Sequence, residues 1–379
     1  MSVLSCLVIC LLFTFVYSKE CYWNSRNPYS YFSTKTPYDA VRGDLRDEIP
    51  LEGCSPTSLW AIVRHGTRHP MATDGAGMKT AMTLKEAIID NFYAGRGEMC
   101  AQDIANLANW TWDDSMDSTW TYLTKEGHQE LLLLGQRVRE RFSPLLGSLD
   151  TFQFRSTDTQ RTRESARAFV EGLENSKFTI EEPIPDGQYD IIRPYRSCEK
   201  YIQLNKTTHD IALEKFRSTK DYQQMLTGVR QRVGLPDLTH QNVTGLYDLC
   251  RYYRAYAVDR RNAWCSVFGN EDLKVLEFIE DLSDQYDCGY SSPYGAKLGA
   301  IPLRNLYENL EASVNGSHRI TGYFTHDTMI EMIVTALGLY HDYPAINSLE
   351  MNRDRKWRTS LLAPFATNLM VVLNKLVSC

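Results

Sequence analysis

Three apolar, strand-like segments that lie far apart in the chain each run directly into a cluster of polar and charged side chains. These segments and their clusters are LWAIV followed by RHGTRHP (59–70), TFQF followed by RSTDTQR (151–161), and GYF followed by THDT (322–328). In an open α/β sheet, ligands bind in the crevice beyond the carboxyl ends of the strands. The sequence therefore predicts one pocket assembled from three distant segments.

The residues between these segments favour helices. Thr124, with Glu126 and Gly127 after it, is expected to open a helix over 131–142, and Asp158 is expected to cap a helix that runs to Gly172. Alternation of strand and helix predicts an α/β domain. We assign it to residues 19–190 and 291–379 and interpret 191–290, which has few alternating runs, as a mostly helical cap insertion over the pocket.

Composition limits the classes of partner. The chain has 379 residues, of which 43% are hydrophobic, which is enough for a large core. Its formal net charge of −6 disfavours nucleic-acid binding, which normally requires a basic face. An anionic small molecule remains a candidate ligand, since a few arginines focused in one cleft suffice to attract it.

The N-terminus has the pattern of an export signal. Residues 1–18 carry no charge and 3–16 are almost wholly apolar, so we expect a signal peptide cleaved after Ser18, with a buried N-terminal helix as the alternative. The run is too short to span a bilayer. The apolar segment 361–377 contains polar residues and Pro364, which favours a buried strand or loop over an anchor. The C-terminus has no retention signal, so we predict secretion.

Eight cysteines remain after signal removal, and none forms a Cys-x-x-Cys pair. An even number in an exported chain favours disulfides, and we predict one local bridge between Cys250 and Cys265. Four sequons, compatible with glycosylation, begin at Asn109, Asn205, Asn242 and Asn315.

The first cluster has the residue types needed to bind and attack a phosphoryl group. Arg64 and Arg68 offer planar forks that match phosphate oxygens. Their positive charge favours the neutral, nucleophilic form of His65. Gly66 allows close backbone approach. This arrangement predicts covalent catalysis through a phosphohistidine.

The other two clusters complete the predicted pocket. Arg161 falls in the first turn of a helix, where an anion is favoured, and Arg155 at the strand end is a further candidate. An alkoxide leaves poorly without a proton, so a general acid is needed. Asp327 is the candidate acid, and His326 is expected to donate to a phosphate oxygen.

The motif Arg-His-Gly-x-Arg-x-Pro at 64–70 resembles that of the histidine acid phosphatases, branch two of the histidine phosphatases. The resemblance continues through 123–127, 155–172 and 325–327. Segments 31–38, 264–268, 272–278 and 362–369 are similar to those of the multiple inositol polyphosphate phosphatases within that family. The resemblance implies a mixed sheet with helices on both faces and a smaller helical cap. It also implies His65 as nucleophile, Asp327 as proton donor, and phosphate binding by Arg64, Arg68, Arg161 and His326.

The leading hypothesis is therefore a phosphomonoesterase that needs no metal or other cofactor. It would act on inositol polyphosphates, phytate included, and on the 3-phosphate of 2,3-bisphosphoglycerate. A substrate with several phosphates needs additional cations, and the candidates for an outer pocket are Lys35, Arg155, Arg193, Arg196 and Lys200. The inositol polyphosphate phosphatases usually carry His-Ala-Glu where this chain has His326-Asp327. That difference keeps a general acid phosphatase acting on small or protein phosphomonoesters as an alternative, and a binding protein with a relict site as a third.

Overall fold

The computed structural model describes residues 21–24, 31–42, 52–204, 208–257, 261–314 and 316–376. In this part of the chain a five-stranded sheet has the order β3-β2-β4-β1-β5. The strands are β1 (Cys54–Arg64), β2 (Thr151–Ser156), β3 (Ile180–Glu181), β4 (Arg319–Thr325) and β5 (Asn368–Leu376). β5 runs antiparallel to β1 and the remaining pairs are parallel, so the predicted mixed sheet is confirmed.

The parallel pairing brings the three predicted clusters to one edge of the sheet. Arg64 at the end of β1 pairs with Thr325 at the end of β4, and Ser156 at the end of β2 pairs with Phe324. The residues that follow these strands therefore leave the sheet side by side, as the sequence predicts.

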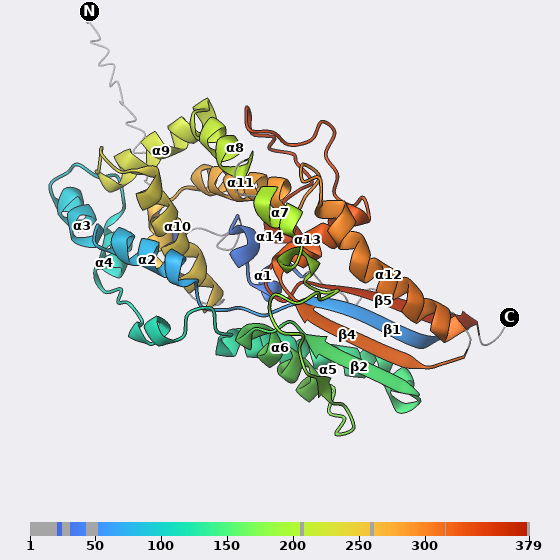
Figure 1. Cartoon of the computed structure of the whole chain (residues 1–379). Helices are drawn as coiled ribbons and strands as arrows, with labels where there is room; N and C mark the ends of the chain where they lie inside the picture. The colour runs from blue at the N-terminus through green and yellow to red at the C-terminus, as the bar shows by residue number, and fades with distance from the viewer. Residues whose placement is uncertain are drawn as a thin grey trace, which may run out of the picture.

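Helices cover both faces of the sheet, as expected (Figure 1). They are α5 (Lys125–Gly147) and α6 (Gln160–Gly172) on one face, and α12 (Gly295–Val314) and α13 (Asp327–Ala336) on the other. Side chains of a strand alternate between its two faces. Accordingly, Leu59 and Val63 of β1 join the core under α5 and α6, whereas Trp60 and Ile62 join the core under α12 and α13.

The starts of α5 and α6 test two predicted caps. Thr124 caps α5, and its hydroxyl accepts a hydrogen bond from the backbone N–H of Gly127 at 3.1 Å. The predicted cap at Asp158 is wrong, because Thr159 is the N-cap of α6. The Asp158 carboxylate instead pairs with the guanidinium of Arg163 one turn into the helix. A nearby cation thus draws the aspartate away from the backbone.

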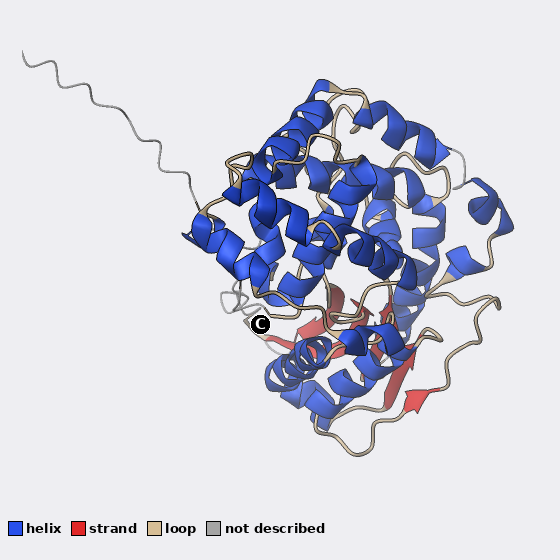
Figure 2. Ribbon diagram, turned by 90° about the vertical axis from the view of Figure 1, so that its left-hand side faces the viewer, coloured by secondary structure: helices blue, strands red, loops and turns tan. Residues whose placement is uncertain are grey.

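A layer of helices stands over the pocket edge of the sheet (Figure 2). Its helices from the predicted cap are α8 (Thr208–Arg217), α9 (Lys220–Val233), α10 (His240–Ala255) and α11 (Asn270–Asp287). The short helix α7 (Glu199–Leu204) packs instead through Tyr201 in the core under α12 and α13. Three earlier helices contribute to the same apolar core: α2 (Ala72–Met82), α3 (Lys85–Tyr93) and α4 (Ala101–Ala108). The helical layer therefore also uses residues from the segment assigned above to the sheet domain, and the domain boundaries stay a prediction.

Short helical elements complete the described structure. They are η1 (Tyr22–Asn24), η2 (Ser33–Lys35), α1 (Tyr38–Val41), η3 (Asp114–Ser118), η4 (Pro194–Arg196), η5 (Ala263–Val267) and α14 (Thr359–Leu362). The apolar segment near the C-terminus contains the end of α14, a loop and all of β5, so the predicted strand is present. It is half-buried to exposed along its length, not buried as expected. Among the described residues, no helix combines the length and apolar character that a bilayer span requires.

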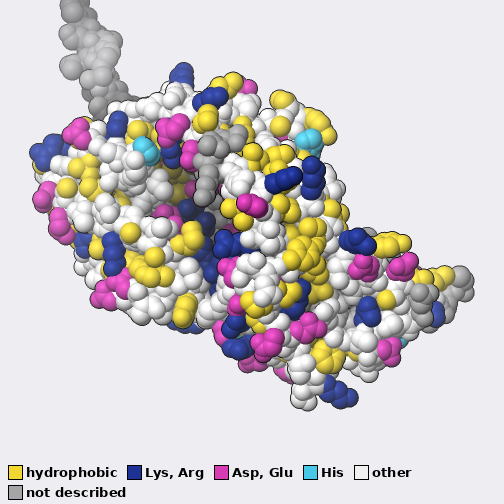
Figure 3. Space-filling model, viewed as in Figure 1, with side chains coloured by type: hydrophobic (Ala, Val, Ile, Leu, Met, Phe, Trp, Pro, Cys, Tyr) yellow, Lys and Arg dark blue, Asp and Glu magenta, His cyan; other side chains and the backbone are white. Residues whose placement is uncertain are grey.

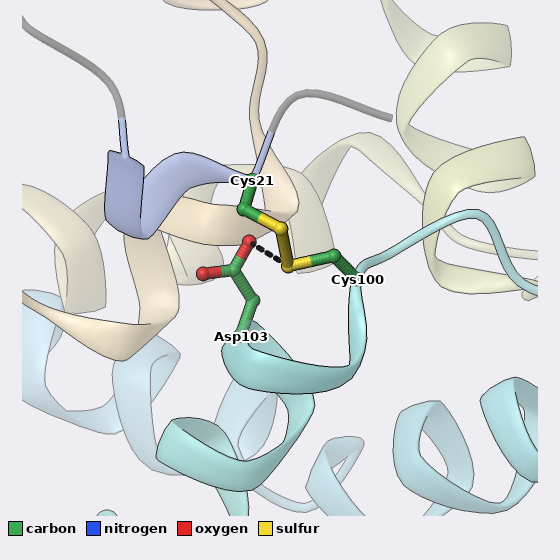
Figure 4. A group of neighbouring side chains, drawn as sticks. All are labelled: Cys21, Cys100 and Asp103. Atoms are coloured by element: carbon green, nitrogen blue, oxygen red, sulfur yellow. Dashed lines mark hydrogen bonds between the residues drawn. A yellow bond between two sulfur atoms is a disulfide. The ribbon is translucent and has the colours of Figure 1, made fainter. Parts of the chain in front are cut away.

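The predicted disulfide between Cys250 and Cys265 is confirmed and ties α10 to η5. A second bridge, Cys21–Cys100, fastens the described N-terminal turn to the start of α4 (Figure 4). The carboxylate of Asp103 beside it accepts the backbone N–H groups of Tyr22 and Trp23 at 2.9 and 3.2 Å. Sulfurs bonded to each other are not thiolate ligands, so this group is not a metal site.

Three other cysteines, Cys54, Cys198 and Cys288, are unpaired in the described part of the chain. Cys379 and the predicted signal peptide lie outside the described residues, as do the sequon positions Asn205 and Asn315. Asn109 is exposed at the end of α4, and Asn242 is half-buried in the first turn of α10.

Candidate active site

The loop after β1 is fixed against the start of α5 by two glycines. A Cβ on Gly66 would lie 2.3 Å from the carbonyl oxygen of Gly127, and a Cβ on Gly127 would lie 2.1 Å from that of Thr67. Glu130, one turn into the helix, accepts the backbone N–H of Thr67 at 2.7 Å and its hydroxyl at 3.0 Å. The backbone that follows His65 is therefore held by close contacts that no larger side chain at positions 66 and 127 permits.

His65 is buried in a tautomer suited to attack. Its Nδ1 lies 2.8 Å from the carbonyl oxygen of Gly66. A carbonyl only accepts, so Nδ1 carries the hydrogen, and Nε2 keeps its lone pair. Burial lowers the pKa of His65 well below its ordinary value, and the positive charges of Arg161 and Arg64 lower it further. The imidazole is therefore neutral, and a neutral imidazole is a nucleophile.

Arg64 is fully buried and held from several sides. Its Nη1 donates to the carbonyl oxygens of Thr34 and Ala363 at 2.5 and 2.6 Å, and its Nη2 donates to Asp327 Oδ2 at 2.8 Å. Its guanidinium carbon lies 4.5 Å from the centre of the Phe365 ring. These contacts fix a permanent positive charge next to His65.

Arg68 and Arg161 add two further positive charges to the pocket. Arg68 is buried, and its Nη1 donates to the carbonyl oxygen of His69 at 2.8 Å and to the Tyr252 hydroxyl at 3.3 Å. Arg161 belongs to the first turn of α6. Burial lowers the pKa of Arg161 to about 10, and the charge of Arg68 acts in the same direction. Two guanidiniums that share a pocket favour an anion between them.

His326 lies beside His65, with ring centres 5.5 Å apart. Arg161 Nη2 donates to its Nδ1 at 3.2 Å, and Thr157 Oγ1 lies 3.0 Å from its Nε2. Because an arginine only donates, Nδ1 is the acceptor and Nε2 carries the hydrogen. In this arrangement His326 orients Arg161, and the ring must gain a second proton before Nδ1 can donate to a phosphate oxygen.

Asp327 opens α13 and faces the pocket as a carboxylate. Its Oδ1 accepts the backbone N–H of Thr328 at 3.0 Å, while Oδ2 binds Arg64. Burial acts to raise the pKa of Asp327, but the charges of Arg64 and Lys35 outweigh it and hold that pKa below its ordinary value. Asp327 is therefore ionised before an anion binds.

The comparisons with known proteins agree with this geometry. A model of the histidine phosphatase superfamily (branch 2) matches residues 57–375. Multiple inositol polyphosphate phosphatase 1 of Drosophila melanogaster is 32% identical over 357 residues, which cover 90% of this chain and 75% of the relative. This chain belongs to branch 2 of the histidine phosphatase superfamily. It is a phosphoric monoester hydrolase.

Other relatives and solved structures extend the likeness. Multiple inositol polyphosphate phosphatase 1 of Homo sapiens is 25% identical over 379 residues, covering 90% of this chain and 77% of the relative. A phytase from D. castellii has a TM-score of 0.71 at 18% identity, covering 92% of this chain and 75% of that one. A Bifidobacterium longum multiple inositol polyphosphate phosphatase, solved with inositol hexasulfate, has a TM-score of 0.65 at 15% identity and covers 91% and 88%. The structures show a shared histidine phosphatase fold.

Two of the predicted outer-pocket residues, Lys35 and Arg193, lie near the phosphatase centre. We use this name for the group formed by Arg64, His65, Arg68, Arg161, His326 and Asp327. Lys35 lies close enough for its charge to depress the pKa of Asp327, and its Nζ donates to Thr34 Oγ1 at 2.9 Å. Burial lowers the pKa of His326 well below its ordinary value, and the charges of Arg161 and Arg193 lower it further. Arg193 is half-buried, and its Nη1 pairs with Asp186 Oδ1 at 3.1 Å. Lys and Arg side chains gather in the hollow between the helical and sheet halves (Figure 3). These cations extend the positive surface away from His65.

The three remaining outer-pocket candidates have other surroundings. Arg155 is buried in an ion pair with Asp190, with Nη1 and Oδ1 at 3.0 Å. Arg196 is exposed and pairs with Asp186 at 3.1 Å. Lys200 is exposed on α7, and within the described part of the chain no ion pair joins it to the pocket. They have no contact of their own with the phosphatase centre among the interactions of the described residues.

Sequence reasoning missed several supporting residues. Phe365 lies under Arg64, and its ring centre is 6.1 Å from that of His65. Ser165 of α6 accepts the backbone N–H of Gly66 at 3.1 Å. The segment 362–369 was noted for its resemblance to the family, but a phenylalanine among apolar residues has no pattern that indicates contact with a catalytic centre.

Proposed function

We propose that this histidine phosphatase hydrolyses inositol polyphosphates, phytate included, through a phosphohistidine at His65. The observation that carries the proposal is the hydrogen bond from His65 Nδ1 to the Gly66 carbonyl. It leaves the lone pair of Nε2 available for attack near the guanidiniums of Arg64, Arg68 and Arg161. The names of the Drosophila and human relatives support the substrate class. Lys35 and Arg193 supply charge for phosphates other than the one transferred.

The first half of the reaction transfers the phosphoryl group to the protein. His65 Nε2 attacks phosphorus in line, and the bond from phosphorus to the ester oxygen breaks. Arg64, Arg68 and Arg161 stabilise the three remaining phosphate oxygens. The departing alkoxide takes its proton from Asp327.

Asp327 must take that proton from solvent when substrate binds. Before binding, its carboxylate is paired with Arg64. A phosphate dianion brings negative charge next to Asp327 and neutralises the field of the arginines, and both effects raise the pKa of a carboxyl group. In the second half of the reaction, Asp327 takes a proton from water, the water oxygen attacks phosphorus, and inorganic phosphate leaves His65. The proposed chemistry needs no metal ion.

The proposed function is tested by measuring phosphate release from phytate and from an aryl phosphate, with and without a chelator. We expect phytate to be preferred in kcat/KM, chelation to have no effect, and His65→Ala to abolish turnover of both substrates. Unchanged activity of His65→Ala contradicts the nucleophile assignment. Release of the 3-phosphate from 2,3-bisphosphoglycerate is a further expected activity, measured in the same assay.

A general acid phosphatase is the second candidate. The observation that favours it is Asp327 at the start of α13, where the inositol polyphosphate phosphatases usually carry glutamate one residue later. If this candidate is correct, we expect an aryl phosphate to be hydrolysed as efficiently as phytate.

We also propose that the chain enters the secretory pathway and is secreted. Expression in animal cells, followed by analysis of the medium, tests this proposal.

A further inference from the structure

A second carboxyl group lies one helical turn behind Asp327. Glu331 follows it by four residues on α13, and residues at this spacing lie on the same side of a helix. Glu331 is 1% exposed. The Cys288 thiol donates to its Oε2 at 2.7 Å, and its Oε1 has no hydrogen-bond partner among the described residues. This buried acid takes no part in the reaction proposed above.

The surroundings of Glu331 favour its neutral form. Its carboxyl group contacts Cys288, which belongs to the apolar core under α12 and α13. The charged and titratable groups that face it are Arg64 from β1, Asp327 from its own helix, and Asp281, Asp284 and Cys288 from α11 and its C-terminus. Arg64 Nη2 is already bound to Asp327. Arg355 pairs with Asp281, and burial raises the pKa of Asp284 well above its ordinary value, so Asp327 is the carboxylate whose charge acts on Glu331.

Burial raises the pKa of Glu331 to about 8, and the negative charge of Asp327 acts in the same direction. Burial likewise raises the pKa of the Cys288 thiol well above its ordinary value, so Cys288 remains a hydrogen-bond donor. Glu331 is thus a neutral acid at neutral pH and becomes a carboxylate in alkaline solution. Its ionisation adds a buried negative charge close to Arg64 and Asp327.

We propose that Glu331 is a positioning residue that controls anion binding in the phosphate pocket. While neutral, it leaves Arg64 and Asp327 paired as described and the field of the arginines undiminished. Once ionised, Glu331 partly neutralises the positive charge of Arg64 and repels the bound phosphate. Anion affinity therefore falls in alkaline solution through Glu331. This proposal rests on the assignment of the arginine cluster as the phosphate-binding site.

Sulfate is a suitable probe, because it mimics a phosphate dianion and does not change its own charge between pH 6 and 9. Sulfate affinity is measured by calorimetry on the full chain at several pH values in this range. From pH 6 to 9 we expect the dissociation constant of the unmodified protein to rise by up to roughly tenfold more than that of Glu331→Gln. By linkage, a group with a pKa of about 8 that must be neutral for the anion to bind lowers the affinity about tenfold by pH 9. Glu331→Gln is neutral at every pH and retains an acceptor for Cys288.

Two further variants keep the test decisive. Glu308→Gln removes an exposed carboxylate from α12, the neighbour of α13, and is expected to behave as the unmodified protein. Glu331→Met is an uncharged replacement suited to the apolar core, and it serves if Glu331→Gln does not fold. Equal pH dependence of sulfate affinity in the unmodified protein and in the folded position-331 variant overturns the proposal.

The experiment separates this inference from the proposed reaction. Sulfate binding needs no turnover, so a protein that fails to hydrolyse phytate still reports on Glu331. Conversely, phytate hydrolysis with no effect of Glu331→Gln on sulfate binding leaves the phosphatase assignment intact and removes only the role of Glu331.

Discussion

At the scale of single residues, the site depends on how each ionisable group is kept in one protonation state. His65 is neutral because it is buried among cations, and Asp327 is ionised because Arg64 binds it. Bound phosphate favours protonation of Asp327 and leaves His65 neutral. The arrangement therefore favours catalysis on the acid side of neutral.

The pH dependence of kcat/KM follows from these two groups. The pKa of His65 is lowered, so its nucleophilic form persists below the ordinary histidine range near 6.5. Asp327 must be protonated to act, and acid favours that state. We expect kcat/KM for phytate to increase as pH falls from 7.5 to 5.5, as measured by initial rates in constant ionic strength. A decrease through the ordinary histidine range would show that His65 becomes protonated there.

Tyr252 of α10 orients Arg68. The Tyr252 hydroxyl accepts from Arg68 Nη1 and donates to Asp74 Oδ2 at 2.9 Å, so it joins the helical layer to the phosphate pocket. We expect Tyr252→Phe to weaken sulfate affinity by about 1 kcal/mol, or roughly fivefold, the usual cost of losing one hydrogen bond. Calorimetry measures this change in sulfate affinity. Tyr253→Phe is the control, since the Tyr253 hydroxyl accepts from the backbone of Asp113 instead; an equal loss in both variants would contradict the role of Tyr252.

The residues of the first and third clusters could be predicted from the sequence, because arginine, histidine and aspartate at strand ends have few structural reasons to occur together. The residues that hold these side chains in place could not be predicted from the sequence. Phe365 reaches Arg64 from a segment 301 positions away along the chain, and Asp158 bound a neighbouring arginine in place of the helix backbone. Such outcomes depend on tertiary neighbours that a local pattern does not contain.

At the scale of elements, the contact between the His65 loop and α5 depends on two glycines. Gly66→Ala and Gly127→Ala each force a Cβ into a backbone carbonyl group. We expect each to lower the free energy of unfolding by about 2 kcal/mol, within the usual range for overpacking, and to reduce kcat. Denaturant unfolding measures it.

Gly77 provides the matched control for these two variants. It is exposed within α2, and a Cβ at this position meets nothing within 4 Å among the described residues. Gly77→Ala is therefore expected to raise the free energy of unfolding by about 0.5–1 kcal/mol, because alanine is the better helix former. Destabilisation of Gly77→Ala to the same extent would show that the measured losses do not come from the close approach.

The disulfide between α10 and η5 closes a short loop. Its cysteines are separated by 15 positions, for which chain entropy gives about 3 kcal/mol. We expect Cys250→Ala with Cys265→Ala to lower the free energy of unfolding by that amount, with the phosphate pocket retained. Thermal unfolding and sulfate binding measure the two effects, and unchanged stability would contradict the structural role of the bridge.

The order of strands and helices was predictable at this scale, since apolar runs and helix periodicity are local. The boundary of the helical layer was not. Met78, Ile88 and Leu107 pack with α8–α11 in one core although they precede the predicted cap by more than 80 positions. Membership of a core depends on the path of the chain in space, which periodicity does not report.

At the scale of the whole molecule, a buried ionic network joins the helical layer to the site. Glu277 of α11 accepts from Arg355 at 2.8 Å and from Arg358 at 3.0 Å. The same segment continues into α14, where Thr359 Oγ1 lies 2.9 Å from Ser33 Oγ, and then to the Ala363 carbonyl that binds Arg64. The network thus holds one side of the pocket to the helical layer.

We expect Glu277→Gln to lower the free energy of unfolding by about 3 kcal/mol, because breaking a buried ion pair leaves charges uncompensated, and to lower kcat/KM. Glu271→Gln on the same helix is the control, since Glu271 is exposed and its pairs with Lys274 and Arg353 contribute less than about 1 kcal/mol. Denaturant unfolding distinguishes the two. Similar losses in both variants would contradict the role given to the network.

Trapping of the phosphorylated protein tests the nucleophile most directly. The chain is mixed with an inositol polyphosphate labelled in its phosphates, quenched within one turnover, and analysed for bound label by mass spectrometry. We predict one phosphoryl group on Nε2 of His65, stable in alkali and lost in acid as an N–P bond requires, and none on His65→Ala. Turnover without any trapped phosphoprotein, or label retained on His65→Ala, would contradict the phosphohistidine.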